Sequence, residues 1–187
     1  VLYRFGDLWK EQRIEASGIT RTLEIGELYS NWNGNELVCA TEEGVVEAFH
    51  WNGKGFEGEI IYREDRAIRN VEIGDFCRLN PGNELIQISY SRNFGNASML
   101  YWKDGQWQSR HLYSSNKGLE ALTLGDFNPL HPGIEPVFAG YAYSVTMVVD
   151  DGLETYSLDI WKDESPSGYL MNEITAVAVG DLLPAHP

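Results

Sequence analysis

Histidines and acidic residues are the side chains of this chain that could bind a metal ion or perform catalysis. His131 and His186 lie at matching positions, each six residues after a glycine. Two imidazoles brought together by neighbouring loops could bind a transition metal. The matching positions elsewhere hold Trp32 and Asn80, so no histidine recurs there. We therefore expect these histidines to be solvated loop residues rather than metal ligands.

No segment of the sequence carries a recognisable catalytic motif. A Gly-x-Ser-x-Gly elbow, a His-Glu-x-x-His pair and a glycine-rich phosphate loop are all absent. Acidic pairs such as Glu64-Asp65 and Asp150-Asp151 suggest the paired carboxylates of a glycosidase. Adjacent residues of a strand point to opposite faces, however, and in turns they are hydrated. We expect a protein without catalytic activity.

Charge and composition limit the classes of partner. The chain has 14 Lys and Arg against 28 Asp and Glu, a formal net charge of −14, which disfavours binding to nucleic acids and to anionic membranes. No apolar stretch is long enough to insert into a membrane. Two cysteines, Cys39 and Cys77, do not make a disulfide framework, and the apolar neighbours of Cys39 predict a core position. No feature indicates a compartment.

An internal repeat of about fifty residues organises the chain. Four segments share an apolar residue, a glycine and an acidic residue: Ile25-Gly26-Glu27, Ile73-Gly74-Asp75, Leu124-Gly125-Asp126 and Val179-Gly180-Asp181. Their glycines are 48, 51 and 55 residues apart. The first three copies have a second glycine eight positions later and a glutamate two positions beyond it: Gly34 and Glu36, Gly82 and Glu84, Gly133 and Glu135.

A second landmark has the same period. An aromatic residue is followed five positions later by an aliphatic one: Trp9 and Ile14, Phe56 and Ile61, Trp107 and Leu112, with Leu153 and Leu158 keeping the spacing in the last copy. Turn sequences precede this landmark: Asn52-Gly53, Asp104-Gly105 and Asp151-Gly152. Such pairs between alternating segments predict β-hairpins. Because the aromatic recurs, we expect Trp9, Phe56 and Trp107 to pack between repeat units.

Each repeat contains four strand-like runs, which in the second repeat cover 68–76, 84–90, 98–102 and 107–113. Four antiparallel strands per unit of about 48–55 residues predict an all-β protein, a β-propeller with four-stranded blades. A β-sandwich is the alternative fold. The predicted units are a partial blade over 1–19, full blades over 20–67, 68–116 and 117–165, and a partial blade over 166–187. A fragment of a larger propeller is favoured over a complete four-bladed ring, and association of two copies through open blade edges is a third possibility.

The segments Val71-Glu72-Ile73-Gly74-Asp75-Phe76 and Leu122-Thr123-Leu124-Gly125-Asp126-Phe127 resemble the FG-GAP (VCBS-like) propeller repeat, as do Glu84 and Glu135 after the loops that follow them. The resemblance extends over the chain through its period. It implies that the Gly-Asp-Phe segment ends the innermost strand of a blade. The following loop then leads to the second strand.

Many members of that family carry a calcium loop of the form D-x-D-x-D-G at this point. The resemblance gives these candidate ligands: Asp75, Asn80, Asn83 and Glu84, then Asp126, Asn128 and Glu135, with Glu27, Asn31, Asn33 and Glu36 in the first repeat. Calcium prefers six to eight oxygen ligands, and two carboxylates per loop are few. We therefore favour acidic side chains that cap backbone amides, and no cofactor, while calcium stays the alternative.

The same loops are the candidate binding surface because their frame recurs while their side chains vary. The residues concerned are Tyr29, Trp32, Arg78, Leu79, Asn80, Leu130 and His131. Loops on a rigid scaffold are where recognition residues concentrate. We expect a non-catalytic binding or scaffolding module for a protein or peptide partner. Two alternatives are a carbohydrate-binding or carbohydrate-active propeller and a calcium-dependent adhesion module.

Overall fold

The computed structural model describes residues 1–29, 31–32, 34–80, 82–91, 93–128, 130, 133–141, 144–150, 154–162 and 174–178. In this part of the chain every regular element is a strand, and the strands form four antiparallel sheets. The prediction of an all-β protein is confirmed. The β-propeller itself is not confirmed, because no closed ring is seen among the described sheets. No helix in the same residues is long and apolar enough to cross a membrane.

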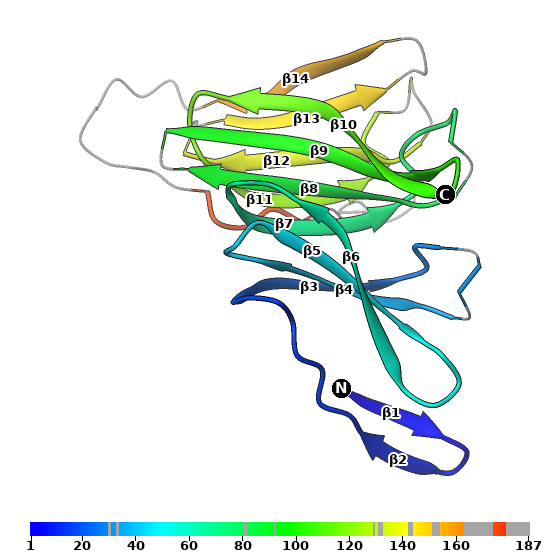
Figure 1. The fold of residues 1–187 in the computed structure, drawn as a ribbon. Helices are drawn as coiled ribbons and strands as arrows, with labels where there is room; N and C mark the ends of the chain where they lie inside the picture. Colours follow the sequence, from blue (N-terminus) through cyan, green and yellow to red (C-terminus); the bar gives the residue numbers. More distant parts are fainter. Residues whose placement is uncertain are drawn as a thin grey trace, which may run out of the picture.

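Three of the sheets have four strands each, paired in chain order, and the fourth is a two-stranded hairpin. The hairpin consists of β1 (Leu2–Phe5) and β2 (Leu8–Glu11). The first four-stranded sheet contains β3 (Thr20–Gly26), β4 (Glu36–Thr41), β5 (Val45–Trp51) and β6 (Phe56–Arg63). The second contains β7 (Ala67–Gly74), β8 (Glu84–Ser91), β9 (Phe94–Lys103) and β10 (Gln106–Ser115). The third contains β11 (Leu119–Gly125), β12 (Glu135–Gly140), β13 (Ser144–Asp150) and β14 (Thr155–Lys162). Figure 1 shows the hairpin beyond the first sheet, away from the other two.

Turn chemistry explains where the strands reverse. Asp104 and Gly105, between β9 and β10, both have positive φ values, 53° and 81°. A two-residue hairpin turn needs positive φ at both central positions, which an Asp-Gly pair supplies at little cost. The four strands predicted across 68–113 are present as β7 to β10. β9 is longer at both ends than the predicted run 98–102.

The fourth strand of each four-stranded sheet contains a β-bulge at the same place. The ladder skips Ile61 in β6, Leu112 in β10 and Ile160 in β14. A bulge inserts an extra residue and re-aims its side chain, and Ile61 and Leu112 are buried between sheets. In the first two sheets the bulge falls on the predicted aliphatic landmark. In the third sheet it falls on Ile160 instead of Leu158.

The core consists of layers between successive sheets, and each layer has the same arrangement. In each layer, one residue from a first strand joins two residues from the second and third strands of the preceding sheet. The two sets are Val71 with Val38 and Ala48, and Leu122 with Ile86 and Met99. Val177, in the segment 174–178 outside any strand, packs against the corresponding residues Val137 and Met147 of the third sheet. The repeat seen in the sequence is therefore also a repeat of the packing.

The glycine that ends each first strand allows adjacent sheets to approach closely. A Cβ at Gly26 would lie 3.2 Å from the Ile73 side chain, and one at Gly74 would lie 2.8 Å from Leu124 Cδ1. These distances are tighter than ordinary contact, so a larger residue would require the Ile73 or Leu124 side chain of the neighbouring sheet to shift. The glycine of the apolar-Gly-acidic motif thus has a packing role.

Candidate functional site

A buried glutamate anchors the loop that follows the first strand of each four-stranded sheet. Its Oε2 accepts hydrogen bonds from two successive backbone N–H groups at the start of the loop. The donors are Leu28 and Tyr29 for Glu36 (2.7 and 3.2 Å), Phe76 and Cys77 for Glu84 (2.9 and 2.9 Å), and Phe127 and Asn128 for Glu135 (2.8 and 3.3 Å). These are the contacts predicted for a capping carboxylate, and they fix the base of each loop.

The candidate calcium ligands differ in exposure and in their hydrogen-bond partners. Asp75 and Asp126 are exposed, whereas Glu84 is fully buried and also accepts a hydrogen bond from Asn80 Nδ2 at 2.7 Å. Burial raises the pKa of Glu84, and the hydrogen bonds from Asn80 and the two amides oppose that rise. Asn128 Oδ1 accepts from the Leu130 amide at 3.1 Å. Over the described ranges, no three His, Cys, Asp or Glu side chains are close enough to hold a metal ion.

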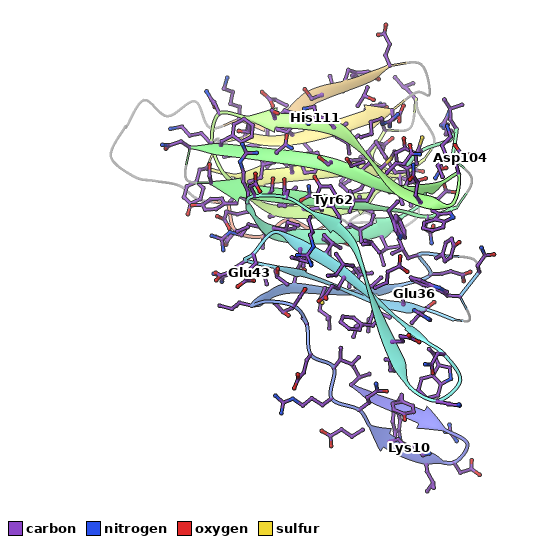
Figure 2. The ribbon with its side chains drawn as sticks, in the orientation of Figure 1. Lys10, Glu36, Glu43, Tyr62, Asp104 and His111 are labelled. Carbon is purple, nitrogen blue, oxygen red and sulfur yellow. The ribbon has the colours of Figure 1, made fainter. Side chains whose placement is uncertain are left out.

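The three anchored loops lie side by side at one end of the stacked sheets. Asn83 in the second loop donates a hydrogen bond from Nδ2 to the backbone carbonyl of Glu27 in the first. A Cβ at Gly133 in the third loop would lie 3.8 Å from the Arg78 guanidinium in the second. Figure 2 shows Glu36 and Asp104 toward this end and Glu43 toward the opposite end. We call this end the loop surface.

A pocket of about 280 Å³ opens between the first and second loops. Its lining combines aromatic rings, amides and one carboxylate: Glu27, Leu28, Tyr29, Asn31, Asn80, Gly82, Asn83 and Trp102. Tyr29 and Asn80 belong to the predicted binding surface. Trp102 is near the end of β9, directly before the Lys103-Asp104-Gly105 turn. Trp102 was not among the residues predicted from the sequence for the binding surface, although this turn was a signal that could have placed it there.

Tyr29 is at the centre of an aromatic cluster beside the pocket. Its ring centroid is 4.6 Å from that of Trp102, 5.1 Å from Trp32 and 6.5 Å from Trp107. Trp32 also stacks on His50, with centroids 4.3 Å apart, and both Trp32 and Trp107 pack against the core between the first two sheets. Trp32 therefore has a packing role as well as a place at the loop surface.

Two leucines and a second pocket extend the loop surface toward the third sheet. Leu79 and Leu130 are 72% and 84% exposed. The second pocket, of about 360 Å³, is lined by Cys77, Leu79, Asn80, Met99, Tyr101, Lys103 and Arg110. Asn80 therefore borders both pockets. His131 and His186 lie outside the described residues.

One expectation about the recurring aromatic is wrong. Trp9 is 71% exposed on β2, although Trp107, at the equivalent position, packs between sheets as predicted. The difference arises because Trp107 lies beside a neighbouring sheet, whereas the hairpin extends beyond the first sheet.

Cys39 and Cys77 are both buried and free, and Cys39 is in the core as expected.

Glu24 and Glu72 occupy equivalent positions on β3 and β7, and they give the protein a pH-dependent stability. Desolvation, with a further contribution from the Glu24 charge, raises the pKa of Glu72 from 4.5 to about 7. Since the folded state holds this proton more tightly, stability falls as pH rises from about 4.5 to about 7.

We therefore expect Glu72→Gln to raise the free energy of unfolding at pH 8 by about 1–2 kcal/mol, allowing for screening by solvent. At pH 4 the same variant should change it by less than about 0.5 kcal/mol, because the carboxyl is then protonated in both states. Urea unfolding at both pH values measures the free energy of unfolding, and Glu59→Gln, at an exposed position, is the control. An equal gain at both pH values would contradict the assignment.

The aromatic and amide pocket, its anchored loops and the exposed leucines make the loop surface the candidate binding site. No protein-family model and no curated protein sequence matches this chain.

Proposed function

We propose that this protein is a non-catalytic binding module of the FG-GAP (VCBS-like) β-propeller type, which recognises a protein or peptide partner through its loop surface. Support for the propeller type comes from the succession of four-stranded antiparallel sheets and from the repeated packing layers between them. Support for binding comes from loops of differing chemistry on a recurring, buried anchor.

The observation that carries the proposal is the position of the two exposed leucines on the loop surface. Leu79 and Leu130 extend into solvent from loops whose bases are fixed by Glu84 and Glu135. Large exposed apolar side chains next to a pocket with aromatic walls are typical of protein-binding surfaces. Anchored loops also reduce the entropy lost on binding, because their bases are already ordered.

Selection from a library of random peptides displayed on phage tests this proposal. We expect enriched peptides to bind the purified protein, and Leu79→Asp to weaken their binding at least tenfold because it places a charge at the apolar contact. Leu158→Asp, at an exposed position on β14, is the matched control and should leave binding unchanged. Failure to enrich any peptide, or equal binding by both variants, would reject a peptide-binding loop surface.

A carbohydrate ligand is the second candidate, and the first pocket favours it. Tyr29 and Trp102 provide aromatic surfaces for the apolar face of a sugar ring, and Asn31 and Asn83 provide amide groups for its hydroxyls. A glycan array with wild type and Asn31→Ala distinguishes the candidates, because the exposed Asn31 can be changed with little effect on folding. Saccharide binding that Asn31→Ala abolishes, without any peptide binding, would replace the first candidate with the second.

A further inference from the structure

The first pocket of the loop surface is negatively charged. Of the described residues that line it, Glu27 is the one with a charged side chain. Glu27 is exposed, and within the described part of the chain its carboxylate has no ion pair or hydrogen bond. A cation that enters this pocket therefore meets a carboxylate that no neighbouring charge neutralises.

Aromatic rings in the same pocket also suit a cation. Tyr29 and Trp102 both line it, and their ring centroids are 4.6 Å apart. The face of an aromatic ring attracts an ammonium or guanidinium group, and the methylene stem of a lysine or arginine packs on the ring. The net charge of −14 attracts cations to the protein as a whole. The first pocket thus has the features that bind a basic side chain.

The second pocket has the opposite charge. Its described lining includes Lys103 and Arg110 and no Asp or Glu. Arg110 forms an ion pair with Asp150, whose side chain is only 2% exposed. Lys103 is exposed, and no ion-pair partner for it is found among the described residues. The second pocket therefore offers one uncompensated positive charge, which favours an acidic group.

Aliphatic side chains accompany this positive charge. Leu79 and Met99 line the second pocket together with Lys103, and Leu79 is 72% exposed. A partner that places a carboxylate at Lys103 can therefore cover Leu79 with an apolar side chain. The chemistry of this pocket fits an acidic residue close to an aliphatic one.

Asn80 joins the two pockets, because it lines both. Its position is fixed from below, since Asn80 Nδ2 donates to Oε1 of the buried Glu84 at 2.7 Å. An extended peptide advances about 3.3 Å per residue, so a short segment that crosses Asn80 reaches both pockets. Two pockets of opposite charge thus lie within one binding path.

We propose that the loop surface recognises a partner segment of mixed charge, in which a basic side chain enters the first pocket and an acidic residue beside an aliphatic one enters the second. This inference rests on the proposed peptide-binding function and specifies its partner. A segment with charges of one sign would be attracted at one pocket and repelled at the other, so the pair of pockets selects against it.

An array of capped hexapeptides is the probe. Each peptide contains one lysine, one leucine and one glutamate in varied order, with serine elsewhere, and its ends are acetylated and amidated so that they carry no charge. Fluorescence anisotropy then gives the affinity of the strongest binder and of two versions of it, in which either the lysine or the glutamate is replaced by glutamine. We expect each replacement to weaken binding about fivefold, since the ion pairs are partly shielded from solvent.

Two protein variants assign each charge of the peptide to its pocket. Glu27→Gln should weaken the parent peptide about fivefold and leave the version without lysine unchanged. Lys103→Gln should weaken the parent peptide to a similar extent and leave the version without glutamate unchanged. Both positions are exposed, so both variants should fold. Glu59→Gln and Lys117→Gln, at exposed positions outside the two pockets, are the matched controls and should bind as wild type does.

The outcomes separate this inference from the proposed function. If peptides bind and Leu79→Asp weakens them, but charged and neutral versions bind equally, the charge pattern is wrong and peptide binding stands. Phage-selected peptides that bind while every peptide of the array fails would also overturn the inference. A neutral saccharide that binds equally to wild type and Glu27→Gln, without any peptide binding, would reject both and assign the first pocket to carbohydrate.

Discussion

Replacing Gly44 with alanine should lower the free energy of unfolding by about 3 kcal/mol or more. Gly44 is in the β4–β5 turn with φ at 76°, and its carbonyl accepts a hydrogen bond from the Glu64 amide at 2.9 Å. A Cβ there would lie 2.1 Å from the Glu64 carbonyl oxygen and 2.5 Å from that of Arg66. Both oxygens belong to the backbone that links the first two sheets, so neither can move away without disturbing that connection.

Gly53 supplies the matched control for this variant. It also has a positive φ, 90°, but a Cβ there would meet nothing within 4 Å. Gly53→Ala should therefore lower the free energy of unfolding by only about 1 kcal/mol, because it carries the cost of the positive φ without the steric clash. Urea unfolding followed by circular dichroism measures both variants, and equal losses would show that crowding at Gly44 is unimportant.

Glu84→Ala should cost about 3 kcal/mol of stability. The carboxylate is fully buried and accepts hydrogen bonds from the Phe76 and Cys77 amides and from Asn80. Truncation leaves these donors without their acceptor, and an unpaired buried donor costs more than the hydrogen bond was worth. Glu84→Gln keeps one acceptor oxygen for the two amides, so we expect an intermediate loss.

Asp75→Ala is the control for loss of a carboxylate in the same loop. Asp75 is exposed, so its removal should change stability by less than about 0.5 kcal/mol. Chemical denaturation of Glu84→Ala and Asp75→Ala, with calcium and with EDTA, measures the loss of stability in each variant and whether that loss depends on calcium. A loss in Glu84→Ala that appeared only with calcium would indicate a metal ligand instead of an amide cap.

The repeat made much of the fold predictable, because the residues that define it act locally. Asp104-Gly105 specifies a hairpin turn whatever surrounds it. The loop anchors were predictable for the same reason. A glutamate at a constant distance after the loop is well placed to reach the amides at its start, as Glu84 does.

Other features depended on neighbours that are distant in the sequence. Trp102 contributes to the first pocket only because the β9–β10 turn reaches the loops of the first two units. Trp9 matches Trp107 in sequence, yet its exposure depends on whether a sheet lies against it. In β14 the bulge selects Ile160 rather than Leu158, because ladder register with β13 decides which residue is extra.

The anchoring glutamates also make the loops modular. From the glycine that ends a first strand to the glutamate that begins the second, the spacing is ten residues in all three units: Gly26 to Glu36, Gly74 to Glu84 and Gly125 to Glu135. A loop of this constant length, held at its base by bonds to backbone atoms, can be transplanted from one unit to another without shifting strand register. The chemistry of the loop surface can therefore be rearranged by exchanging whole segments, while the sheets beneath it keep their pairing.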